Sequence, residues 1–138
     1  MKVPFVDLTL RVQPSLPTFE EPRCFVFGSE DAVRRVYNAT AFQPTLDFDA
    51  VLLIAVHRGV ARSGGYGIRI EGIEATEQAV QVQIRRTDPA AGAFVTMALT
   101  HPLAMVRVER ANLPGKGPWT FDFLDEKGHV FANVHEQV

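Results

Sequence analysis

Two histidines and two aspartates are the side chains best suited to acid–base chemistry. His57 ends an apolar run that predicts a strand, and His101 stands at a break between two predicted strands, so the two imidazoles are candidates to be neighbours. Asp47 and Asp49 are two residues apart, about 7 Å along a strand, as a pair of catalytic carboxylates would be. A pocket near His57 and His101, in a small hydrolase or a small-ligand-binding protein, is therefore the alternative interpretation. The favoured interpretation is that these histidines are structural and the aspartates begin a strand in solvent.

The remaining metal-binding and redox residue types have no spacing that indicates a site. His129 and His135 would face one side of a strand about 20 Å apart, which is too far to share an ion. Cys24 is the only cysteine and lies within the apolar segment CFVF, which predicts a buried thiol and excludes an internal disulfide. We expect no metal and no cofactor.

A glycine-rich loop, RGVARSGGY, follows His57. Ser63 in ARSGG is similar to a nucleophile elbow, but an elbow leads into a helix and the next residues, YGIRIE, alternate as in a strand. The loop also lacks the GK[ST] ending and the helix of a phosphate-binding loop. We therefore expect no catalysis at Ser63, and we expect Gly64 and Gly65 to supply positive φ between two strands.

The strands on either side of this loop should position it. Phe48–Val56 is an almost unbroken apolar run, typical of a central strand that is covered on both faces. Tyr66–Glu71 alternates and predicts a half-exposed strand, with Tyr66 either in the core or beside the loop. Ala79–Arg86 also alternates, and the short link between them predicts an antiparallel hairpin.

The rest of the chain adds further short strands and one helix. Ser29–Asn38 is the predicted helix, with Ser29 as its N-cap and acidic residues in its first turn. Further strands are expected in the first dozen residues and over Arg23–Phe27, Phe94–Leu99, Leu103–Arg110, Trp119–Leu124 and His129–Val134. The pattern predicts a single, mainly β domain over residues 1–138, an antiparallel β-sandwich or partly open barrel of about eight strands with one short helix.

Composition limits the classes of partner. The chain has 14 basic and 16 acidic residues, so we expect no nucleic-acid partner. It has neither the apolar run of a transmembrane helix nor that of a signal peptide, so we expect no membrane partner and a cytoplasmic protein, or a secreted one if a leader has been removed. Phe94–Leu99 is apolar on both faces, and its edge offers a route to a homo-oligomer.

Several segments in the middle of the chain resemble the PrcB C-terminal family of protease-complex subunits. These segments are FDAVLLIAVHRGVARSGGYGIRI, VQVQIRRTDP and LTHPLAMVRVER, within a PrcB-like core of residues 47–110. Ser63 stands where the family often has threonine, and Leu103 follows Pro102 where an aromatic residue is usual. The resemblance implies an accessory or binding protein with no activity of its own.

A more distant similarity links the same two loops to chagasin-like inhibitors of cysteine peptidases. In such a loop, glycines allow close approach of a partner and an aromatic side chain provides an anchor. The leading hypothesis is thus a non-enzymatic protein that binds a protein partner, with a peptidase among the candidates. The predicted partner-binding residues are Arg58, Arg62, Ser63, Gly64, Gly65, Tyr66, His101, Pro102 and Leu103.

Overall fold

The computed structural model describes residues 1–9, 18–37, 46–95, 97–115 and 118–136. Its elements, in chain order, are β1 (Val6–Asp7), β2 (Arg23–Phe27), α2 (Glu30–Val36), β3 (Val51–His57), β4 (Gly67–Ala75), β5 (Ala79–Thr87), β6 (Leu103–Glu109), the 3-10 helix η2 (Arg110–Asn112), β7 (Trp119–Leu124) and β8 (Val130–Glu136). In this described part, no helix is long and apolar enough to cross a membrane.

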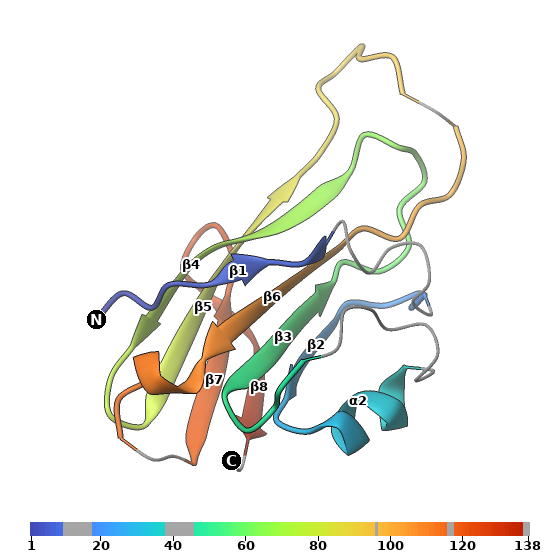
Figure 1. The fold of residues 1–138 in the computed structure, drawn as a ribbon. Helices are drawn as coiled ribbons and strands as arrows, with labels where there is room; N and C mark the ends of the chain where they lie inside the picture. The colour runs from blue at the N-terminus through green and yellow to red at the C-terminus, as the bar shows by residue number, and fades with distance from the viewer. Residues whose placement is uncertain (10–17, 38–45, 96, 116–117, 137–138) are drawn as a thin grey trace.

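The strands form two four-stranded sheets (Figure 1). One sheet has the order β1-β6-β3-β2 and is antiparallel throughout, and the other has the order β4-β5-β7-β8. The predicted mainly β sandwich with one short helix is confirmed, and the sheets do not close into a barrel. One pair departs from the antiparallel prediction, because β5 and β7 run parallel. A long crossover through the other sheet separates these two strands in the chain, and parallel pairing requires such a connection.

The main core lies between the two sheets. Alternate residues of β5, Val80, Val82 and Ile84, are buried there as their spacing predicts, together with Phe121 and Phe123 of β7. Side chains of this size each contribute about 1.5–3 kcal/mol on full burial. This core fixes the position of β4 and β5, and hence of the loops that leave their ends.

A second apolar layer covers the outer face of β3. Leu53 and Ala55 pack with Val33 and Tyr37, which come from α2 and its C-terminal end. All seven residues of β3 are therefore buried, which confirms the prediction of a central strand covered on both faces. The helix begins as predicted, because Ser29 Oγ accepts a hydrogen bond from the Ala32 N–H at 3.1 Å.

Two of the predicted strands need correction. Residues 94–99 form no strand where they are described; this exposed segment extends away from both sheets, and no neighbouring strand pairs with it. The predicted homo-oligomer through a strand edge at residues 94–99 is therefore not supported, because the described residues of this segment form no strand. In the first dozen residues only β1 is a strand, Val6 is exposed while Leu8 is buried, and residues 10–12 lie outside the described part.

The central strand begins at Val51 because Asp47 organises a turn before it. The Asp49 N–H donates to Asp47 Oδ1 at 3.0 Å, and the Val51 N–H donates to the Asp47 carbonyl at 3.0 Å. A side chain that accepts from the backbone two residues ahead favours a turn over a strand. The two aspartates are thus turn residues and not the first residues of the strand.

Candidate partner-binding site

The two predicted binding loops lie side by side and are joined through their backbones. The Ala61 N–H donates to the Thr100 carbonyl at 2.8 Å, and the Thr100 N–H donates to the Ala61 carbonyl at 2.9 Å. Thr100 Oγ1 also donates to the Ser63 carbonyl at 2.8 Å. Residues 58–66 and 100–103, here called the paired loops, therefore form one continuous surface, as a single binding site requires.

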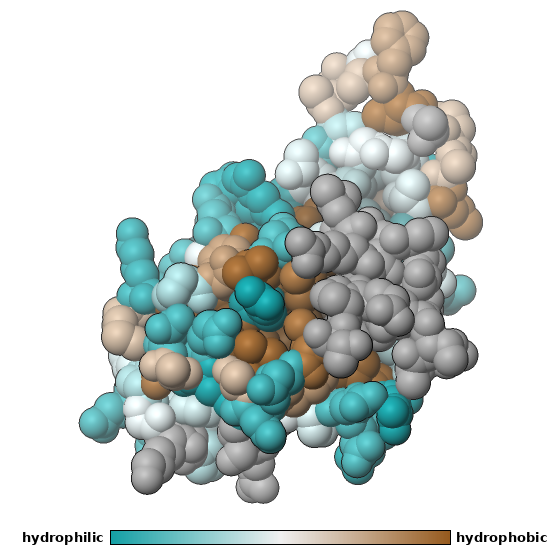
Figure 2. Space-filling model, viewed as in Figure 1, coloured by the Kyte–Doolittle hydropathy of each residue, from teal (hydrophilic) through white to brown (hydrophobic). Residues whose placement is uncertain are grey.

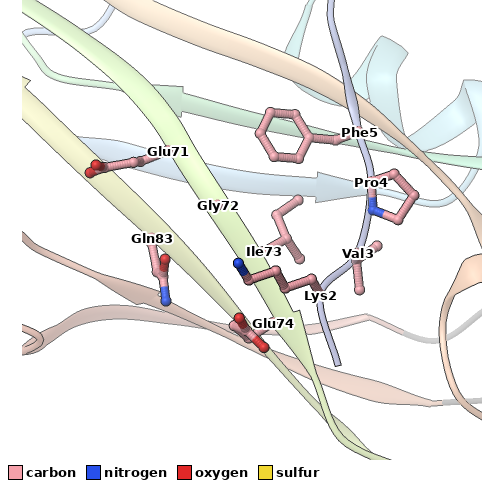
Figure 3. A pocket seen from close by; sticks show the side chains of 9 residues that line it. All are labelled: Lys2, Val3, Pro4, Phe5, Glu71, Gly72, Ile73, Glu74 and Gln83. Carbon is pink, nitrogen blue, oxygen red and sulfur yellow. The ribbon is translucent and has the colours of Figure 1, made fainter.

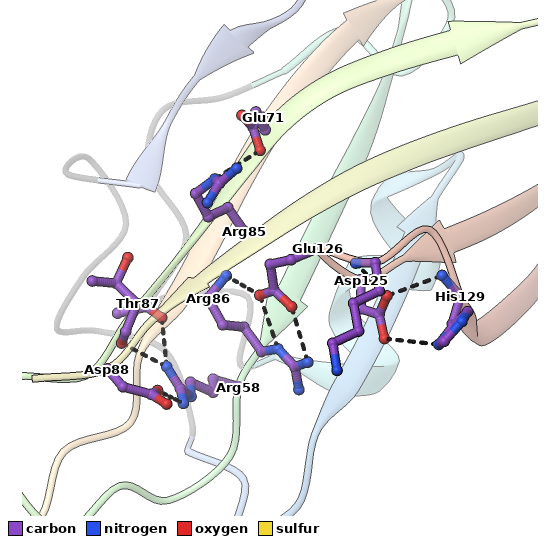
Figure 4. Close-up of polar contacts among 11 residues, drawn as sticks. Arg58, Glu71, Arg85, Arg86, Thr87, Asp88, Asp125, Glu126 and His129 are labelled. Carbon is purple, nitrogen blue, oxygen red and sulfur yellow. Dashed lines mark hydrogen bonds and ion pairs between the residues drawn. The ribbon is translucent and has the colours of Figure 1, made fainter.

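Arg58 fixes the paired loops to the ends of β4 and β5 (Figure 4). Its Nη1 donates to the Gly67 carbonyl at 2.9 Å and to the Thr87 carbonyl at 2.7 Å, and its Nη2 donates to the Asp88 carboxylate. Its guanidinium lies 4.9 Å from the centre of the Tyr66 ring. The side chain is only 18% exposed, so its first role is to hold the loops in place.

Replacement of Arg58 by methionine should lower the free energy of unfolding by about 1–2 kcal/mol, since hydrogen bonds of a partly buried charged group are lost while the aliphatic volume is kept. Chemical denaturation measures this. The matched control is Arg85→Met, which breaks only an exposed pair with Glu71 and should change stability by less than about 0.5 kcal/mol. Equal losses in the two variants would contradict the role assigned to Arg58.

Gly65 allows close packing, but it does not supply the expected positive φ. Neither Gly64 nor Gly65 has positive φ; in this region only Gly59 does, at 97°. A Cβ at Gly65 would lie 2.5 Å from Pro89 Cβ and 2.6 Å from a methyl carbon of Val95. Residues 89–95 thus sit directly against the paired loops because position 65 has no side chain.

A Gly65→Ala substitution should displace residues 89–95 and cost about 1–2 kcal/mol, because the added methyl group would overlap the ring of Pro89, which cannot rotate away, and a methyl group of Val95. Amide chemical shifts of residues 88 and 90–95, compared with those of the wild type, would detect the displacement. Gly67→Ala is the matched control, since its Cβ would meet only Thr87 Cβ at 3.9 Å, an ordinary contact. Unchanged shifts in the Gly65 variant would contradict the packing argument.

His57 is buried and does not face solvent as a catalytic base would. It is 3% exposed, and its Nε2 lies 2.5 Å from the Tyr37 hydroxyl, with which it shares a hydrogen bond. The rings of Phe19 and Phe25 pack edge-on against it. Burial lowers the pKa of His57 to about 4 and raises that of Tyr37. The imidazole is thus a neutral structural group at neutral pH, which agrees with the favoured interpretation.

The two aspartates of the alternative hydrolase hypothesis lie far from His57. Asp47 and Asp49 lie in the turn before β3, whereas His57 is the last residue of that strand, about 20 Å away along it. His101 is half-buried in the paired loops, and the hydrogen bond of His57 goes to Tyr37. Within the described residues, no three His, Cys, Asp or Glu side chains gather to hold a metal ion.

The other predicted site residues differ in their access to solvent. Arg62 and Gly64 are exposed, and Tyr66, His101 and Pro102 are half-buried. Ser63 and Leu103 are buried, at 7% and 8% exposed, and contribute through their backbones and packing. A partner that contacts the paired loops would therefore meet the exposed Arg62 and Gly64 directly, whereas Tyr66, His101 and Pro102 are partly accessible.

Residues 89–99, here called the finger, were not predicted as part of the site. Phe94 is fully exposed, and Met97 and Leu99 are 87% and 67% exposed. The finger projects beyond the two sheets, and its tip is apolar (Figure 2). Its sequence, PAAGAFVTMAL, has no charge and does not alternate, and this signal argues against the predicted strand.

A separate cavity of about 420 Å³ lies between the N-terminal segment and the β4–β5 hairpin (Figure 3). Lys2 and Phe5 line it from the N-terminal segment, Glu71 and Glu74 from β4, and Gln83 from β5. The register shift between Ile70 and Gly72 interrupts the hairpin beside it. No residue of the paired loops or the finger contributes to it, so it is a separate feature of the surface.

The paired loops, the finger and the two strands that support them lie in one continuous part of the chain. Residues 52–109 match the PrcB C-terminal family model. This match runs from β3 to β6. It confirms the resemblance to the PrcB C-terminal family that we noted in the sequence. It covers less than half of the chain and leaves β1, β2, α2, β7 and β8 outside.

No curated protein and no solved structure matches the chain significantly. The PrcB C-terminal match is thus the finding that bears on function, and the similarity to chagasin-like inhibitors stays a prediction. Every residue predicted to bind a partner lies within the matched segment.

Proposed function

We propose that this chain is a non-enzymatic accessory protein that binds a protein partner of a protease complex through the paired loops. The observation that carries the proposal is the backbone pairing of Ala61 with Thr100, which unites two segments about 40 residues apart in the chain. A surface held by internal hydrogen bonds loses little conformational entropy on binding. The PrcB C-terminal match over residues 52–109 supports the kind of partner, a protease or a protein bound to one.

The exposed side chains of the paired loops also suit a protein partner. Arg62 is exposed beside half-buried Tyr66 and His101, and interfaces are enriched in arginine and aromatic residues. Arg58 keeps the Tyr66 ring in place, so the aromatic face is presented at little entropic cost. A docking role needs such a rigid surface and does not need an acid, a base or a nucleophile.

Affinity capture from the cells that make the protein tests this proposal, with three baits compared by mass spectrometry. The baits are the wild type, an Arg62→Glu/His101→Glu variant of the paired loops, and an Arg35→Glu/His135→Glu control. The control makes the same charge change at exposed positions on α2 and β8. Equal melting temperatures would show that all three baits are folded.

We expect the wild type and the control to retain the same peptidase or peptidase-bound protein, and the loop variant to lose it. Reversing the charge of an interface arginine and placing a second carboxylate beside it weakens binding by about tenfold or more. Recovery of one and the same set of proteins by all three baits would refute binding through the paired loops.

A further inference from the structure

The three most exposed large apolar side chains of the described residues lie on the finger. Phe94, Met97 and Leu99 together present on the order of 400–500 Å², since a large apolar or aromatic side chain covers about 150–250 Å² when fully exposed. The largest apolar patch on a monomeric protein is typically about 300–600 Å² and is often functional. Val60, 44% exposed at the paired loops, adds to the apolar surface at this end of the molecule.

The base of the finger is held at three points. Asp88 pairs with Arg58, Pro89 and Val95 pack against the backbone of Gly65, and Thr100 pairs with Ala61. The tip is therefore presented in a limited range of orientations, which lowers the entropy lost on insertion into a partner. Because the finger is convex and its described residues form no strand at the tip, its counterpart must be concave.

The charges around the base favour a protein cleft over an anionic membrane. A membrane-inserting loop generally has free basic residues at its base to bind lipid headgroups. Here Arg58, Arg85 and Arg86 are paired with Asp88, Glu71 and Glu126, respectively (Figure 4). Arg62 and Arg69 are exposed, but two arginines fall short of the cluster of about four to eight basic residues that binds anionic headgroups. The net charge of the chain is −2, so its bulk field does not draw it to an anionic surface either.

A second copy of this chain offers no matching receptor in the cavities described. The cavity of Figure 3 is lined by Lys2, Glu71 and Glu74, and the adjoining one by Glu74 and Gln81. Insertion of Phe94 there would desolvate charged groups without a partner for them, which is unfavourable. The uncharged, apolar tip of the finger therefore suits a cleft that is lined by uncharged, apolar residues.

We propose that Phe94, Met97 and Leu99 anchor the chain in an uncharged, apolar cleft of its protein partner. This inference rests on the proposed function and names the element that enters the partner, while the paired loops contact the rim of the cleft. The partner is thus a protein with an open groove for an apolar segment, as an endopeptidase of apolar specificity has.

Site-specific photocrosslinking tests the inference in the cells that make the protein. Benzoylphenylalanine replaces Phe94 in one variant, Arg62 in a second and Phe131 in a third. Phe131 is a 40% exposed phenylalanine on β8 and controls for non-specific reaction of an exposed aromatic side chain. Mass spectrometry of the adducts identifies both the partner and the residues attached to the probe.

The expected result is a protein adduct at position 94, with a yield at least about tenfold above that at position 131, attached to uncharged apolar residues. Phe94→Asp/Met97→Asp should also lower the yield from the probe at position 62 by about tenfold. The matched control Val6→Asp/Val130→Asp, at exposed valines of β1 and β8, should not.

Four outcomes would overturn the inference. They are an adduct at position 94 with phospholipid, one with a second copy of the chain, one with a charged protein surface, and no adduct at 94 while position 62 gives one. The last of these would leave the proposed function standing, because a partner would still contact the paired loops. Absence of adducts at both positions would refute the inference and the proposed function together.

Discussion

A Gly59→Ala variant should lose about 2–5 kcal/mol of stability, because the new side chain would add both backbone strain and a steric clash at this residue. Gly59 has φ of 97°, where a side chain adds about 1–2 kcal/mol of backbone strain. A Cβ there would also lie 2.8 Å from the Glu20 carbonyl oxygen and 3.1 Å from Pro22 N. These are backbone atoms, so the clash needs a shift of the chain and adds about 1–3 kcal/mol.

A Gly92→Ala variant separates the backbone strain from the steric clash. Gly92 has φ of 78°, but a Cβ there would have nothing within 4 Å, so only the strain of about 1–2 kcal/mol is expected. Urea unfolding followed by the fluorescence of Trp119, the single tryptophan and a buried residue, measures both variants. Equal losses in the two variants would mean that contact with residues 20–22 contributes nothing.

The Gly59 substitution should also alter the paired loops. Gly59 follows Arg58 directly, and the Val60 N–H donates to the Glu20 carbonyl at 3.0 Å, so the segment before β2 supports the loop from behind. A shift at Gly59 would move Arg58 relative to Asp88 and the base of the finger. We therefore expect weaker partner binding in this variant, even at temperatures where it remains folded.

Stability should fall by about 3 kcal/mol between pH 6.5 and pH 4 because of His57. Burial lowers the pKa of His57 from 6.5 to about 4, so in this range the unfolded chain binds a proton that the folded chain does not. The free energy of unfolding therefore decreases as pH falls through this window and is fully retained above it. A difference of about 2.5 pKa units corresponds to the stated loss.

Urea unfolding of the wild type and of His57→Gln at several pH values tests this. Glutamine is neutral throughout and can still hydrogen-bond to Tyr37, so its stability should change little between pH 6.5 and pH 4.5 beyond the common background. The control His135→Gln replaces an exposed imidazole on β8 and should keep the pH dependence of the wild type. A wild-type slope that persists in the His57 variant would contradict the assignment.

The Glu126 carboxylate changes the free energy of unfolding in a lower pH range than His57 does. Hydrogen bonds from Arg86 lower the pKa of Glu126 from 4.5 to about 2, so the unfolded state binds the extra proton only between these values. That contribution is lost as pH falls below about 4.5, after most of the His57 effect is complete. Measurements above pH 4.5 therefore isolate the histidine.

The sequence alone determined the elements whose patterns are local. The alternation of β5 and the N-cap of α2 both follow from side-chain spacing and capping chemistry within about ten residues. The unbroken apolar run of β3 also indicated burial on both faces. The sequence could not say that α2 would cover one of them, because that depends on packing between distant segments.

Only the tertiary structure decided how the candidate site is assembled. Arg58 forms hydrogen bonds within the chain, because the ends of β4 and β5 place two carbonyl groups and Asp88 close to its guanidinium. Gly65 needs no positive φ but leaves room for Pro89 and Val95, a contact of residues 24 and more positions apart. Phe94, Met97 and Leu99 lie in a segment of strand-like composition, but no described strand pairs with it, and the three side chains form the exposed tip of the finger. Hydrogen-bonding partners and free edges are properties of the folded arrangement, and local sequence does not specify them.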